Sequence, residues 1–359
     1  MKKYTTANNK YFPARNQYLN ILSISLFLFI TVVGVHAQIV PITASKNSSP
    51  IKKKSMGKML GADISFLPQL EYKGIKFSDN GQEKDALQIL KDHKINYIRL
   101  RIFNNPSADS GYSPKHGFCD LEQTKAMAKR VKAAGMKFLL DFHYSDTWAD
   151  PGKQFKPSAW EGMDFAQLKI AIQQYTKDVL LALKAQGTLP DMVQVGNEIS
   201  HGMIWPEGRL ENMDTLTQFI KAGIAGVNEV DPSINIMLHI ACGGQNKESR
   251  YFLDYMLSHG VKYDVIGQSY YPQWHGTLDS LKDNLTDLAK RYKQDVIVVE
   301  YTEHKVEVND IVFHLPKNKG KGTCIWEPLS TWEYFVEKNG NTNKLINIYQ
   351  KVAKKYNIK

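Results

Sequence analysis

The chain has 359 residues, of which 43% are hydrophobic and 23% charged, an ordinary globular composition that allows one large domain or two small ones. Its formal charge is +10. No basic helix or arm is concentrated enough for nucleic acid, whereas a mild attraction for acidic polysaccharide stays open. Cys119, Cys242 and Cys324 lie far apart in sequence and could form at most one bond, which excludes a disulfide scaffold.

The N-terminus has the three parts of an export signal. Four basic residues come first, an apolar run from about Ile21 to Val35 follows, and Val35-His36-Ala37 has the small-x-small form of a cleavage site. The run is shorter than the roughly 20 residues of a membrane span, so a retained anchor is the less favoured alternative. We predict that residues 1–37 are removed and that the exported chain, which begins at Gln38, is periplasmic or extracellular without stable membrane insertion.

After a predicted solvated linker at residues 38–57, strand-like and helix-like segments alternate to the end of the chain. The predicted strands are Met59–Ile64, Ile95–Phe103, Met136–Phe142, Met192–Gly196, Asn235–Ile240, Val265–Ser269, Val296–Val299 and Thr323–Trp326. The predicted helices are Glu83–His93, Leu121–Ala134, Phe165–Gln186, Met213–Val230, Lys247–Ser258, Leu278–Tyr292 and Asn343–Tyr356.

This order and spacing predict an α/β fold, a single-domain (β/α)₈ TIM barrel over residues 58–359. The segment Val306–Pro316, between the last two strands, is the least helical by pattern. A doubly wound open sheet is the competing fold, but it would need a glycine-rich phosphate turn after an early strand, and none is present. The run from Lys317 to Gly322 precedes a strand, so in a barrel it lies on the face opposite the active site.

Two apolar runs end abruptly in a carboxylate. Asp191–Glu198 and Asp295–Glu300 each have the continuous apolar character of a buried parallel strand and each end in glutamate. Because the carboxyl ends of barrel strands face the active site, the pair Glu198 and Glu300 indicates two catalytic carboxylates. The alternative is that each glutamate only ends its strand and pairs with a nearby lysine or arginine.

The other predicted strand ends are rich in carboxylates, their hydrogen-bonding partners and aromatic side chains. They carry Asp63, Arg101, Asp141, His143, Asn197, Glu198, Tyr270, Glu300 and Trp326, and the following loops add Trp148, Trp160, Trp205 and Trp274. A sugar ring stacks its C–H face on indole, so tryptophans beside paired carboxylates indicate a carbohydrate substrate. We predict that Trp148, Trp205 and Trp326 line the substrate groove, the alternative for each being ordinary packing under a loop.

Several motifs resemble those of one enzyme family. The run at residues 141–154, DFHYSDTWADPGKQ, looks like the signature of family 53 glycoside hydrolases, the endo-β-1,4-galactanases of clan A. Further similarity lies in GADIS at 61–65, RLRIFNNP at 99–106, QVGNEI at 194–199, SYYP at 269–272 and WEP at 326–328. The resemblance covers about residues 58 to 350, and the 141–154 run is specific to the family rather than to barrels at large.

The resemblance implies a role for each matching residue. Glu198 corresponds to the acid/base and Glu300 to the nucleophile of a retaining mechanism, for which we expect carboxyl groups about 5 to 5.5 Å apart. The other implied roles are Asn197 on the sugar 2-hydroxyl, Arg101 and Tyr270 as the groups that keep the nucleophile ionised, Trp326 as the floor under the cleaved bond, and His143 near the reacting sugar.

The sequence departs from the family pattern in two places. Tyr301 stands between Glu300 and Thr302, where threonine usually follows the nucleophile directly, and Glu303-His304 is unfamiliar. The loop after the last strand, residues 329–332, is short, which argues against the structural calcium that some bacterial members bind there. No cofactor is required by the implied chemistry.

The sequence therefore predicts an exported endo-β-1,4-galactanase that acts on the polysaccharide galactan or arabinogalactan, without a nucleic-acid partner. Another clan A β-glycanase is the alternative within enzymes, because many specificities share the two glutamates. A glycan-binding barrel that has lost catalysis would be expected to lack a carboxylate, and both are present. A metalloenzyme that uses His143, His239 and Glu300 is a third class, but no ligand motif matches it.

Overall fold

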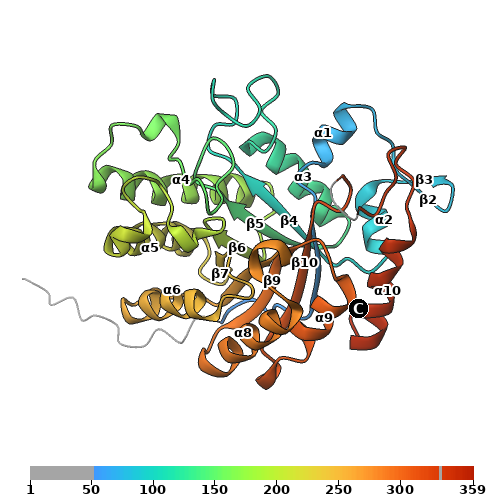
Figure 1. Cartoon of the computed structure of the whole chain (residues 1–359). Helices are drawn as coiled ribbons and strands as arrows, with labels where there is room; N and C mark the ends of the chain where they lie inside the picture. The colour runs from blue at the N-terminus through green and yellow to red at the C-terminus, as the bar shows by residue number, and fades with distance from the viewer. Residues whose placement is uncertain (1–51, 331–333) are drawn as a thin grey trace, which may run out of the picture. The chain divides into compact units, whose positions relative to one another are not determined.

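The computed structural model describes residues 52–330 and 334–359 (Figure 1). The predicted export signal, the mature N-terminus, most of the predicted linker and Trp332 lie outside the described residues. The described residues all belong to one compact unit.

Eight parallel strands close into a barrel, which confirms the predicted fold. The ring runs in the order β1-β10-β9-β8-β7-β6-β5-β4, so the first strand pairs with both the last strand and the second barrel strand. The strands are β1 (Met59–Asp63), β4 (Tyr97–Ile102), β5 (Lys137–Phe142), β6 (Met192–Val195), β7 (Asn235–Ile240), β8 (Val265–Tyr270), β9 (Asp295–Tyr301) and β10 (Gly320–Trp326), and a two-stranded hairpin β2 (Ser78–Asp79) and β3 (Gln82–Glu83) stands apart.

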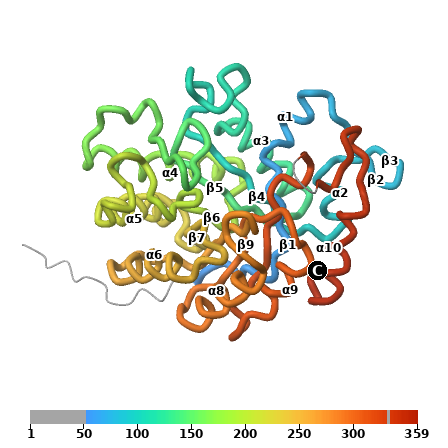
Figure 2. The backbone as a smooth tube through the Cα atoms, in the orientation of Figure 1, coloured from blue at the N-terminus to red at the C-terminus, as the bar shows by residue number. Residues whose placement is uncertain are grey.

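Helices surround this ring and alternate with its strands (Figure 1). They are α1 (Leu67–Tyr72), α2 (Ala86–Asp92), α3 (Leu121–Ala133), α4 (Phe165–Ala185), α5 (Met213–Val230), α6 (Asn246–Ser258), α7 (Pro272–His275), α8 (Leu278–Arg291), α9 (Lys305–Phe313) and α10 (Asn347–Tyr356). The tube in Figure 2 shows the chain returning at α10 to the region where it enters β1, and Lys58 Nζ donates to the Tyr356 carbonyl at 2.8 Å. None of the helices in the described part of the chain is long and apolar enough to cross a membrane.

Helix α9 occupies the segment whose sequence pattern was least helical. Val308 and Val312 are fully buried, and Asn309 donates from Nδ2 to the Tyr301 hydroxyl at 3.1 Å. The helix therefore depends on its contacts with β9 and β10 rather than on a regular apolar stripe, which is the usual way in which tertiary packing overrides a weak local pattern.

The apolar residues form two layers that the sheet separates. One layer fills the space between strands and helices, and the other fills the barrel interior. The interior layer consists of Met56, Met59, Tyr97, Leu139, Met192, Met237, Val265, Ile297, Val299 and Cys324. Because side chains alternate along a strand, residues two positions apart share the interior face, and this rule decides which strand-end residues reach the active site.

Residues 52–57 close the N-terminal end of the barrel. Met56 is only 9% exposed and belongs to the interior layer. Around it, the Lys54 amide donates to the Ser233 carbonyl at 3.0 Å, and Asn235 Nδ2 donates to the Lys54 carbonyl at 2.9 Å. Within the predicted linker, Met56 is therefore buried rather than solvated, and the paired backbone groups beside it anchor the segment, while Lys52, Ser55 and Gly57 are exposed.

Candidate active site

A cleft crosses the carboxyl ends of the barrel strands. It consists of two cavities of about 380 and 600 Å³, which share Asp150, Glu198, Glu300 and Trp326 in their walls. The first is completed by Asp63, Arg99, Arg101, His143, Trp148, Ala149 and Asn197, and the second by Pro151, His201, Ala241, Cys242, Gln245, Glu248, Tyr271, Trp274 and His275. Both glutamates thus lie where the two halves of the cleft meet.

The pairing of β8 with β9 shifts just before Glu300. Gln268 pairs with Val298 but Ser269 pairs with Glu300, so Val299 is an extra residue in β9. Val299 packs in the barrel interior, and the shift lets Glu300, the next residue, also face inward. A bulge of this kind re-aims a side chain, here the carboxylate at the junction of the two cavities.

Arg99, rather than the predicted Arg101, holds Glu300. Arg99 Nη1 donates to Glu300 Oε2 at 3.1 Å, whereas Arg101 Nη1 donates to Glu327 Oε1 at 2.7 Å and to Asp63 Oδ1 at 3.4 Å. Both arginines face the barrel interior because they are two residues apart on β4. The resemblance indicated the right strand and face, but Arg99, two residues before Arg101, is the arginine that reaches Glu300.

Tyr271, rather than the predicted Tyr270, is the hydroxyl donor to Glu300. Tyr271 Oη donates to Glu300 Oε1 at 2.9 Å, whereas Tyr270 Oη donates to the Gly276 carbonyl at 3.1 Å. Ser269 faces the interior, so alternation turns Tyr270 toward the outer layer and brings Tyr271 back to the cleft.

Arg99 is the centre of a buried polar network. Arg99 is 1% exposed, and the five carboxylate and amide groups around it come from the ends of four strands, β1, β5, β6 and β9. It donates to Asp63 Oδ2 (2.9 Å), Asp141 Oδ2 (2.8 Å), Glu300 Oε2 (3.1 Å), Asn197 Oδ1 (2.8 Å) and Gln194 Oε1 (3.3 Å). These charge-assisted bonds fix the positions of the groups around Glu300.

Glu198 follows a sharp turn at the end of β6. Gly196 has φ of 87° and Glu198 has φ of 49°, and a side chain at Gly196 would meet Ile199 Cγ2 at 2.5 Å. Glycine at this position therefore allows the chain to turn away from the barrel as soon as it leaves the strand. The turn leaves the Glu198 carboxyl in the cleft wall, where Ser269 Oγ donates to its Oε1 at 2.6 Å.

The two glutamates have different electrostatic surroundings. Burial raises the pKa of Glu198 to about 8, the negative charge of Glu300 adds to this, and the Ser269 hydrogen bond partly opposes it. Burial also raises the pKa of Glu300, but Arg99 and the Tyr271 hydroxyl act in the opposite direction and favour its ionised form. Glu198 is therefore the better proton donor of the pair and Glu300 the better anion.

Aromatic side chains line the cleft on both sides of the glutamates. Trp148 and Trp326 have ring centroids 6.4 Å apart, and both line the first cavity. The Arg101 guanidinium lies over the Trp148 ring, 4.3 Å from its centroid, and this contact helps to hold the indole in place. Trp274, which is 60% exposed, lines the second cavity and contacts Tyr271 edge-on.

The structure does not bring Trp205 to either cavity. Its Nε1 donates to the His201 carbonyl at 3.1 Å, and the Arg209 guanidinium covers its ring at 4.4 Å. It supports the loop that carries His201, a residue of the second cavity. Trp160, in a neighbouring loop, is buried in the outer core at 6% exposure.

The other predicted site residues lie together in the first cavity or directly behind it. Asp141 bonds Arg99 and lies 3.1 Å from His143 Nε2, and His143 Nδ1 accepts from the Ala149 amide at 3.0 Å. Asn197 Nδ2 donates to the Ala149 carbonyl at 2.8 Å. Sequence reasoning missed Arg99, Tyr271 and Asp150; two inward arginines on one strand were the available signal for Arg99.

The residues of the metalloenzyme alternative are occupied by protein partners. His239 Nε2 lies 2.8 Å from Ser269 Oγ, and its Nδ1 lies 3.0 Å from Gln194 Nε2. His143 has both ring nitrogens within hydrogen-bond distance of protein atoms, as described above. In the described ranges, no three His, Cys, Asp or Glu side chains form a group that could hold a metal ion.

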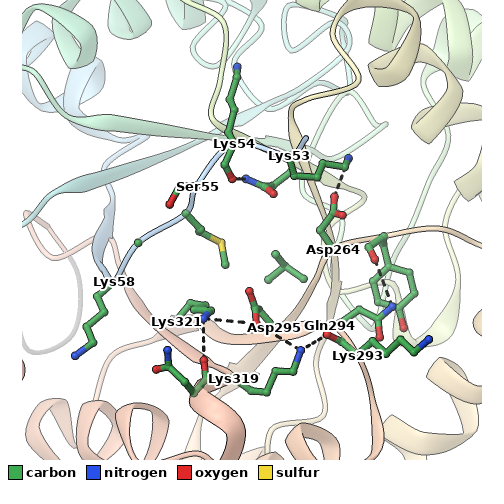
Figure 3. A pocket seen from close by; sticks show the side chains of 16 residues that line it. Lys53, Lys54, Ser55, Lys58, Asp264, Lys293, Gln294, Asp295, Lys319 and Lys321 are labelled. Carbon is green, nitrogen blue, oxygen red and sulfur yellow. Dashed lines mark hydrogen bonds and ion pairs between the residues drawn. The ribbon is translucent and has the colours of Figure 1, made fainter. Parts of the chain in front are cut away.

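A cavity of about 690 Å³, larger than either half of the cleft, lies at the opposite end of the barrel (Figure 3). Its wall includes Asp295, the first residue of the strand whose other end carries Glu300. Lys53 pairs with Asp264 at 2.9 Å, and Lys319 and Lys321 lie 3.8 and 3.7 Å from Asp295. This confirms that the lysine run at 317–322 lies away from the cleft, and size alone does not identify the active site.

Comparison with known proteins agrees with this geometry. The profile of glycosyl hydrolase family 53 matches residues 59–355, from β1 into α10. The chain belongs to this family. It is 33% identical over 294 residues to the endo-beta-1,4-galactanase of Bacillus subtilis (strain 168), covering 82% of this chain and 66% of that protein. It is 38% identical over 250 residues to a probable arabinogalactan endo-beta-1,4-galactanase A of Neosartorya fischeri, covering 67% and 68%.

A solved structure of the same family extends the agreement to three dimensions. The family 53 catalytic domain of Ignisphaera aggregans superposes with a TM-score of 0.78 at 30% identity, over 85% of this chain and 98% of that domain. The similarity includes the whole barrel, and family membership makes the chain a glycoside hydrolase by descent. The chain spans about two thirds of the length of the galactanase relatives, so its own bond specificity is considered below as a proposal.

Proposed function

We propose that the protein is an endo-β-1,4-galactanase that hydrolyses galactan or arabinogalactan type I with retention of anomeric configuration. The observation that carries the proposal is the position of two glutamates with opposite electrostatic surroundings at the junction of two cavities. A chain bound across both cavities would present one glycosidic bond at this junction, which is the arrangement an endo-acting enzyme needs. The family match and the galactanase names of the relatives support galactan as the substrate.

In the first step, Glu300 attacks the anomeric carbon and Glu198 protonates the departing oxygen. Arg99 and Tyr271 stabilise the carboxylate of Glu300 before it attacks, and they release it as its charge passes into the new ester bond. Glu198, with a pKa of about 8, retains a proton at neutral pH. In the second step, the ionised Glu198 takes a proton from water, which attacks the glycosyl ester.

The surrounding residues position the sugar. Asn197 is held by Arg99 and Ala149 and faces the first cavity, where it would hold the 2-hydroxyl of the reacting galactose. Trp326 borders both cavities and would lie under the cleaved bond, while Trp148 and His143 line the first cavity. No step requires a metal or an organic cofactor.

Two variants test the roles of the glutamates. Glu300→Ala should lose activity on every substrate, because no other group can form the ester. Glu198→Ala should still form the ester from an aryl β-galactoside with a good leaving group, and added azide should release it as the β-azide. An α-configured product, or azide rescue at Glu300→Ala that gives the β-azide, would contradict the assignment.

Substrate and location need separate measurements. Product analysis on galactan beside mannan, xylan and cellulose should show release of galacto-oligosaccharides only; hydrolysis of another polymer at a similar rate would move the protein to another clan A specificity.

We also propose that the protein is exported. N-terminal sequencing of protein from the culture medium or periplasm should begin at Gln38, and retention of Met1 would contradict this.

A further inference from the structure

A chain of hydrogen bonds runs from the barrel interior to Glu198. Ser269 Oγ donates to Glu198 Oε1 at 2.6 Å, and His239 Nε2 lies 2.8 Å behind Ser269 Oγ. Both Ser269 and His239 are fully buried, on the neighbouring strands β8 and β7. In the mechanism proposed above, neither residue touches the substrate, yet a hydroxyl and an imidazole have been placed behind the proton donor.

The partners of Gln194 determine the proton on His239. Gln194 Oε1 accepts from Arg99 Nε at 3.3 Å and its Nε2 donates to Asp141 Oδ1 at 2.5 Å, so the amide orientation is fixed. The second hydrogen of Nε2 has three acceptors within reach, and His239 Nδ1 at 3.0 Å is nearer than the Gly196 carbonyl or Asn197 Oδ1, both at 3.2 Å. The Glu198 amide also donates to His239 Nδ1, at 3.4 Å. Two donors face Nδ1 against one acceptor, Asn197 Oδ1 at 3.0 Å.

These contacts favour the imidazole with its hydrogen on Nε2. Burial holds the pKa of His239 well below its ordinary value, so the ring is neutral and carries one hydrogen. With that hydrogen on Nε2, His239 donates to Ser269 Oγ, and the single hydrogen of Ser269 must then point to Glu198 Oε1. The direction of every bond from Gln194 to Glu198 is thereby set.

The consequence falls on the second oxygen of Glu198. Oε1 is occupied as an acceptor, whereas Oε2 makes no hydrogen bond to any residue in the described ranges, and Glu198 forms part of the wall of both cavities. We propose that His239 and Ser269 are positioning residues that keep the catalytic proton on Oε2, the oxygen that faces the glycosidic bond. This inference rests on the proposed acid/base role of Glu198.

Each step of the reaction would use the hydrogen bonds from His239 through Ser269 to Glu198 without changing their direction. When Glu198 gives its proton from Oε2 to the departing oxygen, the Ser269 hydrogen bond stabilises the carboxylate that remains. When water attacks the glycosyl ester, its proton returns to Oε2. The hydrogens of Ser269 and His239 stay in place throughout. These two residues therefore orient the Glu198 carboxyl and do not carry protons.

Other charged groups around Glu198 set the background for a pH test. Glu300 on β9 and Asp150 in the loop after β5 raise the pKa of Glu198, and Arg99 on β4 lowers it. His239 on β7 is neutral. Replacing Ser269 leaves all four in place, so a change in the titration of Glu198 reports on the hydroxyl.

The test is the pH profile of kcat/KM for Ser269→Ala and Ser269→Thr. Loss of one hydrogen bond to a charged group should move the alkaline limb upward by about one pH unit in Ser269→Ala. The loss in kcat/KM should be at least about tenfold larger on galactan than on an aryl galactoside whose leaving group needs no proton. Ser269→Thr, which keeps the hydroxyl, should retain the original limb, and His239→Ala should shift it in the same direction, without adding to the effect of Ser269→Ala.

Ser249→Ala is the matched control, because Ser249 is also fully buried and donates to the Cys242 carbonyl, with no contact to either glutamate. If Ser269→Ala and Ser249→Ala have the same alkaline limb, or if both substrates lose activity equally, the positioning role is wrong. Infrared difference spectra of the Glu198 carboxyl, with Glu198→Gln as reference, give the pKa without turnover. A wild-type protein inactive on galactan would refute the proposed function, whereas an unshifted carboxyl band in Ser269→Ala would refute this inference alone.

Discussion

The two ends of the barrel use charge in opposite ways. At the carboxyl end, Arg99 is 1% exposed and bonds three carboxylates. At the amino end, Lys53 pairs with Asp264 (Figure 3). These two side chains are about one-third exposed, and Met56 closes the interior. Buried ion networks are a costly way to obtain stability, and an apolar plug is a cheap one. The carboxyl end therefore retains its charges for chemistry, while the amino end is built for closure.

The largest expected effect separates the two ends directly. Arg99→Ala would leave Asp63, Asp141 and Glu300 buried without their common cation, so the free energy of unfolding should fall by about 3 to 5 kcal/mol. Lys53→Ala, at the amino end, should cost less than about 1 kcal/mol because its pair with Asp264 is partly solvated. Urea unfolding of both variants checks this, and similar losses would remove the distinction.

The next prediction separates the role of Met56 in closing the barrel interior from catalysis. Met56→Ala should lower the free energy of unfolding by roughly 2 to 3 kcal/mol, at the low end for a buried methionine because the side chain lies at the rim of the interior. Its kcat/KM on galactan should equal that of the wild type at temperatures where both are folded. A large loss of activity in the folded variant would show that the amino end communicates with the cleft.

The distinction between the two ends could be read from the sequence only in part. The strands were predictable because β-branched runs such as Val296–Val299 alternate with amphipathic helices, and their carboxyl ends collected Glu198 and Glu300. Closure by residues 52–57 was not, since a single methionine among lysines carries no periodic signal. Its burial depends on the ring of strands that it enters.

The orientation of individual strand-end residues was the second limit. Tyr270 and Tyr271 are adjacent tyrosines, and only the alternation that starts from Ser269 decides which one meets Glu300. The extra residue Val299 shifts β9 against β8, and nothing in the run Val296–Glu300 marks that position. A family resemblance supplies residue types at each strand end, but side-chain direction depends on register between strands.

A third prediction tests whether the burial of Glu198 lowers the free energy of unfolding. The pKa of Glu198 is about 8 when folded, against an ordinary value of 4.5. Below pH 4.5 both states are protonated; between pH 4.5 and 8 the unfolded chain releases this proton first, so folding stability falls as pH rises through this window. Glu198→Gln should therefore unfold like the wild type at pH 4 and be more stable by on the order of 4 kcal/mol at pH 8.

The control for this pH test is Glu161→Gln, at an exposed carboxyl on the surface. It should not change the pH dependence of unfolding. If Glu198→Gln gains no stability between pH 4 and pH 8, the burial of Glu198 carries no folding cost, and the contrast between the two ends weakens.

The smallest effect on stability is expected at the open side of the cleft. Trp274 is 60% exposed, lines the second cavity and contacts Tyr271 with a centroid distance of 5.6 Å. Trp274→Ala should raise KM for galactan by roughly 3- to 10-fold through loss of an aromatic contact. The free energy of unfolding should change by less than about 0.5 kcal/mol, because little packing is lost at an exposed side chain.

Tyr251 on α6 is 59% exposed and lines neither cavity of the cleft, so Tyr251→Ala measures what removal of an equally exposed aromatic ring does by itself. Equal KM values in the two variants would mean that the sugar chain does not pass over Trp274.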